Sequence, residues 1–282
     1  METLVWEHLA EGRRLMKIAV IQMEVKESVA ENLAHGERLI RQAAEAGADL
    51  LVLPEMFCCL YTNESFVAHG EPESGEICGR MAAAARENQV YLVAGSMPER
   101  EGEKIYNTSF VYDNQGQRIA RHRKVHLFDI HVEGGQHFAE SDTFTGGDSR
   151  TVFDTPFGRF GLCICFDMRF PELAMAMTLD GAQAILVPAA FNMTTGPAHW
   201  ESMFRQRAVD NQLFTVGAAP ARDEAGPYVS YGNSIICGPW GNVMARADQR
   251  EAILYAELDW EENAKIRRQL PLLSSRKPEI YR

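Results

Sequence analysis

The chain has 282 residues, 46% of them hydrophobic and 24% charged, which is typical of a globular protein with enough apolar side chains for a sizeable core. Its formal net charge of -11 would repel phosphate groups, so we expect no nucleic-acid partner. No segment approaches the ~20 apolar residues of a membrane-spanning helix, and charges throughout the N-terminal segment argue against a signal peptide. Together with six cysteines that lack disulfide-framework spacing, these features predict reduced thiols, no membrane partner and a cytoplasmic location.

Strand-like runs rich in valine, isoleucine and leucine recur along the whole chain. They lie at residues 17–22, 49–53, 90–95, 106–112, 160–165, 184–188, 213–218, 234–237 and 253–258. Helical patterns separate several of these runs, and the first pattern opens with a capping box formed by Ser28 and Glu31. The helical patterns cover residues 28–46, 74–88, 171–180, 197–211 and 260–270.

Continuously apolar strands at residues 50–53 and 185–187 predict that both faces of each strand are buried. Two mixed sheets packed face to face, each covered outside by helices, would bury all of these faces. The sequence therefore predicts an α/β fold, a four-layer α-β-β-α sandwich. Because it contains no repeat, low-complexity tract or linker, we expect one domain over residues 16–282, preceded by an N-terminal extension over residues 1–15.

Two charged residues stand beside apolar segments of predicted strands. Glu55 follows an apolar strand and a proline, at the strand end where open sheets place active sites. A methionine and a phenylalanine come next, so the carboxylate would be partly desolvated and suited to acid-base catalysis. Lys124 ends a basic run and precedes apolar and aromatic residues, where an ammonium could stabilise a negative oxygen. Taken singly, each residue has the alternative interpretation of a solvated surface side chain.

Cys165 ends the apolar run at residues 160–165, and Pro171 marks the first turn of the next helix. In this strand-turn-helix arrangement, the helix dipole and a nearby lysine would lower the thiol pKa and favour the nucleophilic thiolate. The alternative for a single cysteine is packing in the core, which is the interpretation we adopt for Cys163 and Cys237. No histidine stands in a papain-like or caspase-like context, so a histidine partner is not indicated.

Metal, nucleotide and redox chemistry have little support in the sequence. His126, His131 and His137 are separated by five and six residues, which matches no standard zinc pattern. The sequence contains no Gly-x-Gly-x-x-Gly motif, no phosphate-binding loop and no Cys-x-x-Cys motif. We therefore expect neither a metal nor another cofactor.

Three segments taken together resemble the nitrilase superfamily of carbon-nitrogen hydrolases, and the resemblance runs from about residue 16 to the C-terminus. They contain Glu55, Lys124 and Cys165 and cover residues 53–57, 123–129 and 161–172. In a fourth segment, Glu140 occupies the position of the second glutamate of this superfamily. The resemblance implies that Cys165 is the nucleophile, Glu55 the acid-base residue and Lys124 the oxyanion donor, while Glu140 orients Lys124 and the substrate amide. It also implies that water is the second reactant and that the protein is a homodimer or a higher homo-oligomer.

Other segments resemble the omega-amidases, which hydrolyse the terminal amide of alpha-ketoglutaramate and alpha-ketosuccinamate. These segments are residues 190–200, 207–212, 220–223 and 238–241. The sequence departs from the superfamily pattern at residues 131–133, which replace a loop that often carries proline, and at Phe166, where tyrosine is common. These departures concern the shape of the loops and the details of substrate binding.

An omega-amide substrate carries a carboxylate far from the reacting amide, which calls for a cation in the pocket. Arg169, four residues beyond Cys165, is the candidate, and a structural role in holding the turn is its alternative. The resemblance places Phe191 and Thr194 in the same pocket, and Phe166 is a further candidate substrate contact.

Several other functions remain open from the sequence alone. A nitrilase, an N-carbamoyl amide hydrolase and an amidase acting on deaminated glutathione would share the same three catalytic residues. A non-catalytic ligand-binding or scaffold relative, or a thiol-based redox protein, would belong to a different class. Retention of all three catalytic residue types argues against the scaffold, and the missing Cys-x-x-Cys motif argues against the redox protein.

Overall fold

The computed structural model describes residues 15–133 and 137–281, so the predicted N-terminal extension lies outside the described residues except for Leu15. The strands of the first sheet are β1 (Leu15–Gln22), β2 (Leu50–Val52), β3 (Tyr91–Val93), β4 (Met97–Glu101), β5 (Lys104–Tyr112), β6 (Arg118–Arg123) and β15 (Ala252–Asp259). Their order is β15-β1-β2-β3-β5-β4, and β6 pairs with β5. The three strands β1, β2 and β3 run parallel and the other pairings are antiparallel, so this sheet is mixed.

The second large sheet is also mixed. Its strands are β9 (Thr151–Thr155), β10 (Gly158–Leu162), β11 (Ala184–Pro188), β12 (Phe214–Ala218), β13 (Ile235–Cys237) and β14 (Val243–Arg246). Their order is β14-β13-β12-β11-β10-β9, with β10, β11 and β12 parallel. A separate hairpin is formed by β7 (Asp129–His131) and β8 (His137–Ala139).

The helices of the described chain are α1 (Val29–Glu45), α2 (Asn63–His69), α3 (Glu76–Asn88), α4 (Pro171–Leu179), α5 (Gly196–Asn211) and α6 (Trp260–Gln269). Short 3₁₀ helices cover Glu140–Asp142, Cys165–Arg169 and Pro278–Ile280. Ser28 is the N-cap of α1, where its hydroxyl accepts a hydrogen bond from the Glu31 N–H at 3.3 Å, as the sequence predicts. Within residues 15–133 and 137–281, no helix is long and apolar enough to cross a membrane.

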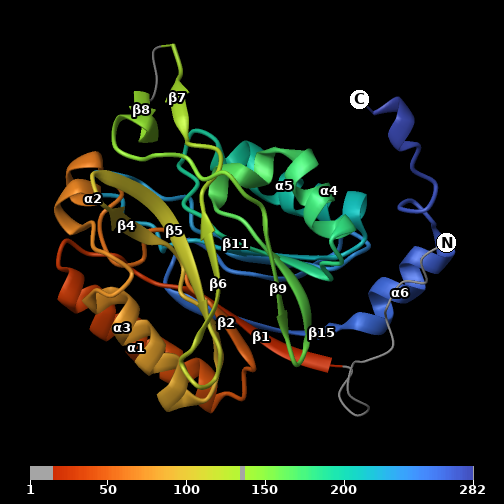
Figure 1. Cartoon of the computed structure of the whole chain (residues 1–282), viewed down its shortest axis with the longest axis horizontal. Helices are drawn as coiled ribbons and strands as arrows, with labels where there is room; N and C mark the ends of the chain where they lie inside the picture. Colours follow the sequence, from red (N-terminus) through yellow and green to blue (C-terminus); the bar gives the residue numbers. More distant parts are fainter. Residues whose placement is uncertain (1–14, 134–136, 282) are drawn as a thin grey trace.

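Three clusters of buried side chains show how the layers pack. Ile18 of β1 and Leu186 of β11 belong to the cluster that fills the space between the two sheets. On the outer face of the first sheet, side chains of α1 and α3 pack on the strands, and α4 and α5 cover the second sheet in the same way. Figure 1 shows α1 and α3 on one side of the strands and α4 and α5 on the other. The predicted four-layer α-β-β-α sandwich is therefore confirmed.

The predicted end of the strand at residues 160–165, which leads to Cys165, was wrong. The apolar run at residues 160–165 predicts a continuous strand, but β10 ends at Leu162 and Cys165 begins a 3₁₀ helix. Cys165 adopts a left-handed conformation with φ of 47°, which is uncommon for a residue with a side chain and incompatible with a strand. Glu55 follows β2 and Cys165 follows β10, so both lie beyond the carboxyl ends of central parallel strands.

Candidate active site

The loop after β2 fixes Glu55 in a buried position, with 1% of its surface exposed. The next residue, Met56, has a positive φ of 50°, and its N–H donates to the Ser96 hydroxyl at 3.1 Å. Gly95 also has a positive φ, and a Cβ there would lie 2.1 Å from the Pro54 carbonyl oxygen. Only glycine therefore allows these two loops to approach so closely, and their contact holds Glu55 in place.

Lys124 lies between two carboxylates. It follows β6, and its ammonium donates to Glu55 Oε1 at 2.8 Å and to Glu140 Oε1 at 2.9 Å. All three side chains are fully buried. Burial by itself would lower the lysine pKa, but the charges of Glu140 and Glu55 outweigh it and raise the pKa of Lys124 above its ordinary value. The structure thus brings together three predicted site residues around a stable ammonium.

Two further side chains complete this cluster, and neither was predicted from the sequence. The Tyr61 hydroxyl lies 2.5 Å from Glu140 Oε1 and 3.2 Å from Glu55 Oε1. The Asn107 amide donates to Glu55 Oε1 at 2.8 Å. The three donors converge on Glu55 Oε1 and leave Oε2 buried without a hydrogen-bond partner among the described residues. A polar residue in the fully buried stretch of β5 was the one signal that could have revealed Asn107.

Glu140 begins a 3₁₀ helix and is held from its other side as well. Its Oε2 accepts a hydrogen bond from the Phe128 N–H at 2.6 Å, so both carboxylate oxygens are engaged. Burial and the neighbouring Glu55 raise the pKa of Glu140, while Lys124 opposes this shift. With no free oxygen, Glu140 is suited to orienting the lysine.

Cys165 lies beside Glu55, and the negative charge of Glu55 disfavours the thiolate form of Cys165. Burial first, and then the negative Glu55, raise the pKa of the Cys165 thiol well above its ordinary value. The Lys124 charge and a hydrogen bond with the Ala190 backbone offset part of this shift. The expectation of a lowered thiol pKa was therefore wrong, because the thiol is buried, Glu55 faces it and only a short 3₁₀ helix follows it. The resting thiol is protonated, and its attack requires a base.

A fully buried carboxylate, Asp167, joins the two chain segments that carry the lysine and the cysteine. Its Oδ1 accepts hydrogen bonds from the N–H groups of Val125 at 3.2 Å and His126 at 2.9 Å. Its Oδ2 accepts one from the Ile164 N–H at 3.1 Å and lies 2.9 Å from His122 Nε2. Burial would raise the pKa of Asp167, but these contacts outweigh it and lower the pKa. No pattern in the sequence singled out Asp167.

Arg169 lies close enough to Cys165 to be affected by its charge. Its guanidinium carbon lies 5.5 Å from the centre of the Phe166 ring and 4.9 Å from that of Phe191. One terminal nitrogen lies 3.1 Å from His199 Nδ1. No ion pair with a carboxylate is found for Arg169 in the described part of the chain, and its buried Nε has no hydrogen-bond partner there. Arg169 is thus a half-buried cation that retains donors for an anion.

The alternative role for Arg169, holding the turn, is performed by another arginine. Arg207 of α5 donates from Nε to the Met168 carbonyl at 3.1 Å and from a terminal nitrogen to the Arg169 carbonyl at 3.0 Å. Thr194, by contrast, is exposed in the loop before α5, and its N–H donates to Asn192 Oδ1 at 3.1 Å. Its exposure separates it from the buried cluster, so its pocket role stays a prediction.

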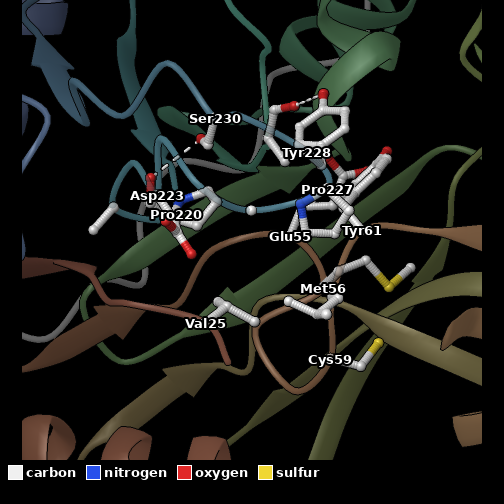
Figure 2. Close-up of a pocket in the computed structure, with 14 residues that line it drawn as sticks. Val25, Glu55, Met56, Cys59, Tyr61, Pro220, Asp223, Pro227, Tyr228 and Ser230 are labelled. Carbon is white, nitrogen blue, oxygen red and sulfur yellow. Dashed lines mark hydrogen bonds between the residues drawn. The ribbon is translucent and has the colours of Figure 1, made fainter. Parts of the chain in front are cut away.

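A cavity of about 40 Å³ reaches Glu55 from one side (Figure 2). Tyr61, Tyr228 and Ala190 form its wall near Glu55, and Phe166, Arg169, Phe191 and Thr194 are not among its lining residues. Tyr228 stacks on Tyr61 with ring centres 4.5 Å apart and was also missed by the sequence analysis. Over residues 15–133 and 137–281, no group of three or more histidine, cysteine, aspartate or glutamate residues is arranged to hold a metal ion.

Comparisons with known proteins agree with this geometry. The family described as carbon-nitrogen hydrolase matches residues 17–268. The omega-amidase NIT2 of Mus musculus is 43% identical over 265 residues, which cover 94% of this chain and 96% of that relative. The crystal structure of Saccharomyces cerevisiae Nit3, a member of branch 10 of the nitrilase superfamily, matches with a TM-score of 0.87 and 36% identity, covering 95% of this chain and 97% of that one.

A mutant of the amidase from Nesterenkonia sp. AN1, which carries the acetamide moiety of fluoroacetamide at its active-site cysteine, matches with a TM-score of 0.78 and 26% identity. The alignment covers 97% of this chain and 98% of that one. The resemblance seen in the sequence is therefore confirmed over nearly the whole chain. The protein belongs to the carbon-nitrogen hydrolase family.

Proposed function

We propose that the protein is an omega-amidase, a thiol amidohydrolase that releases ammonia from alpha-ketoglutaramate and alpha-ketosuccinamate. The observation that carries this proposal is Arg169 beside Cys165, half-buried and without a carboxylate partner among the described residues, which suits a short amide with a carboxylate at its far end. The 43% identity to the omega-amidase NIT2 of Mus musculus supports the same substrate class. Alpha-keto acids with a terminal amide have both features in one small molecule.

In the first step, the Cys165 sulfur attacks the amide carbon and its proton passes to Glu55. We assign the base to Oε2 of Glu55, because Oε1 already accepts hydrogen bonds from Lys124 and other donors while Oε2 is free. The carbonyl oxygen becomes negative, and the Lys124 ammonium, together with the backbone N–H after the cysteine, stabilises it. Each such donor contributes roughly 3–4 kcal/mol.

In the second step, the carbon-nitrogen bond breaks and Glu55 returns the proton to the departing nitrogen, which leaves as ammonia. The acyl group remains on Cys165 as a thioester. Glu55 then takes a proton from water, whose oxygen attacks the thioester carbon and releases the acid and the thiol. The covalent adduct at the cysteine of the Nesterenkonia amidase supports a covalent intermediate of this kind. Glu140 holds Lys124 and orients the substrate amide, and the cycle needs no cofactor.

Substrate choice provides the test of this proposal. We expect purified protein to release ammonia from alpha-ketoglutaramate in preference to a nitrile, an N-carbamoyl amino acid and deaminated glutathione. Preference for one of the other three substrates would retain the mechanism and contradict the omega-amidase assignment. No turnover of any of them would favour a non-catalytic relative.

Arg169→Leu is expected to raise the KM for alpha-ketoglutaramate by about 10- to 100-fold, since a charge-assisted hydrogen bond contributes about 1.5–3 kcal/mol. The matched control is a short neutral amide, for which the KM of the variant should equal that of the wild type. Arg169→Lys should keep part of the affinity because the charge remains. Equal losses for both amides would show that Arg169 supports the fold of the site and not the binding of an anion. Phe166, Phe191 and Thr194 complete the proposed substrate contacts.

We further propose that the protein is a homodimer or a higher homo-oligomer. Val209 of α5, Trp240 and Val243 are 37%, 61% and 38% exposed, and α5 and the β13–β14 turn are joined by the Arg205 bond to the Gly241 carbonyl at 2.8 Å. Figure 1 shows the chain beyond α6 extending away from the sheets. We expect light scattering to give at least twice the monomer mass, and Trp240→Glu to reduce it. A monomeric wild type would contradict the proposal.

The remaining proposals concern the whole chain. We propose a single catalytic domain over residues 16–282, supported by the family match to residues 17–268. All six cysteines are free and buried, which supports the proposed cytoplasmic location.

A further inference from the structure

The cavity beside Glu55 has a mouth and an inner end. At its inner end lie Glu55, Tyr61 and Tyr228, and exposed residues of the loop after β12, including Asp223 and Pro227, belong to its lining. In Figure 2, Asp223 lies well apart from Glu55 and Tyr61. We name this space the Glu55 cavity; its full lining is Val25, Glu55, Met56, Cys59, Leu60, Tyr61, Ala190, Pro220, Ala221, Asp223, Gly226, Pro227, Tyr228 and Ser230.

Residues at the inner end of the Glu55 cavity also surround the nucleophile, Cys165. Cys165 is not a lining residue, but Glu55, Ala190 and Tyr228 each line the cavity and each interact with Cys165. The cavity therefore adjoins the residues that surround the thiol. The Tyr228 hydroxyl donates to the Ala190 carbonyl, which ties two of these residues together.

The acyl part of the substrate lies elsewhere in the proposed mechanism. Arg169, the proposed partner of the far carboxylate, stands with Phe166 and Phe191, and none of the three lines the Glu55 cavity. The cavity volume of about 40 Å³ also suits small molecules, since one water needs roughly 10–15 Å³ of such space. It has room for water and ammonia.

The chemistry places ammonia and water on the same side of the carbonyl carbon. Glu55 gives its proton to the departing nitrogen, so this nitrogen faces Glu55, and the attacking water must later occupy the same position. While the thioester exists, the acyl group anchored at Arg169 fills the approach from the substrate side. Glu55 is the residue that both handles these two molecules and lines the cavity.

We propose that the Glu55 cavity is the passage through which ammonia leaves the site and water enters to hydrolyse the thioester. This inference rests on the proposed amidase mechanism. The carboxylate of Asp223 in the lining of the passage favours the departure of nitrogen as ammonium. With this side passage, the acyl group can close the substrate entrance during hydrolysis while water still reaches the thioester.

The experiment fills the passage from two different segments of its lining. Ala221→Leu enlarges an 8% exposed side chain of the lining, and Val25→Phe enlarges a half-buried side chain from a different segment. Val67→Phe, at a 52% exposed position of α2 outside the lining, is the matched control for added bulk. Circular dichroism melts check that each variant is folded, and the two variants depend on different segments of the fold.

For each protein, we measure the kcat and the KM for alpha-ketoglutaramate. The amount of thioester is measured by mass spectrometry after acid quenching. We expect both filled variants to show kcat about 10-fold lower, a KM that does not rise and a thioester that accumulates during turnover, while Val67→Phe behaves like the wild type. Wild-type kcat in both filled variants would overturn the proposal. A raised KM without accumulated thioester would also overturn it, because it would place the acyl group in the cavity.

Measurements on the wild type alone distinguish failure of the proposed function from failure of the proposed passage. If the wild type hydrolyses another amide and not alpha-ketoglutaramate, the omega-amidase assignment fails, and the same comparison of thioester levels with that amide still tests the passage. A wild type without turnover of any amide overturns both.

Discussion

Replacing Cys165 with serine is expected to lower the rate of ammonia release from alpha-ketoglutaramate by at least about 10⁴-fold, as removal of an essential nucleophile does in other hydrolases. The resting thiol is already protonated, because burial and Glu55 raise its pKa. Attack therefore requires proton transfer to a carboxylate, which is a weak base. A serine hydroxyl holds its proton far more tightly than a thiol, so the same carboxylate cannot activate it.

The matched control for this change is Cys163→Ala, two residues earlier in the same segment. Cys163 is 1% exposed and belongs to the cluster between the second sheet and its helices, so its loss should lower the melting temperature and leave kcat within a few-fold of wild type. Turnover by Cys165→Ser at the wild-type rate would disprove the proposed mechanism. Equal loss in both variants would point to damage of the fold.

The sequence was sufficient to predict the layers of the fold because burial leaves a local pattern. Leu51 packs toward the helices and Leu50 and Val52 toward the second sheet, which is why this strand is apolar at every position. The order of the strands has no such local signature. β15 joins β1 along its whole length, pairing Leu15 with Asp259, and this partner is far away in the sequence. The short α2 was also missed, because a helix of two turns gives too little periodicity.

The candidate site was predictable where a residue stands in a motif and not where it acts through distant contacts. Glu55, Lys124 and Glu140 lie together as the resemblance implies. Tyr61 and Asp167 were missed, since their roles depend on partners 79 and 42 residues away that only the folded chain brings near. For the same reason, no pattern in the sequence indicated that burial and a facing carboxylate would raise the pKa of the Cys165 thiol.

The structure also adds evidence on two interpretations of Arg169 that the sequence left open. Arg169 and Arg207 both lie close to the turn after the nucleophile, and either could have held it. Because the side chain of Arg207 makes both bonds to the turn carbonyls, the side chain of Arg169 remains available for another ligand. The contacts of Arg207 depend on where α5 packs, which no local pattern of the sequence specifies.

Lys124→Met is expected to lower both the rate and the stability. It removes a proposed oxyanion donor, and such a loss reduces kcat by about 10²–10³-fold. It also leaves Glu55 and Glu140, both fully buried, without the cation that lies 2.8 and 2.9 Å from them. Removing one partner of a buried ion pair costs about 3–5 kcal/mol of unfolding free energy. Chemical denaturation and ammonia release measure the two effects.

A double variant separates the two roles of the lysine. In Lys124→Met/Glu140→Gln, one of the two uncompensated carboxylates becomes a neutral amide, so much of the unfolding free energy should return. The ammonium is still absent, so kcat should stay as low as in Lys124→Met. Glu140→Gln alone is the control, because it keeps the lysine and its bond to Glu55. If the double variant regained activity together with stability, the lysine would serve the fold only, and the charge on the tetrahedral oxygen would have to be stabilised by backbone N–H groups alone.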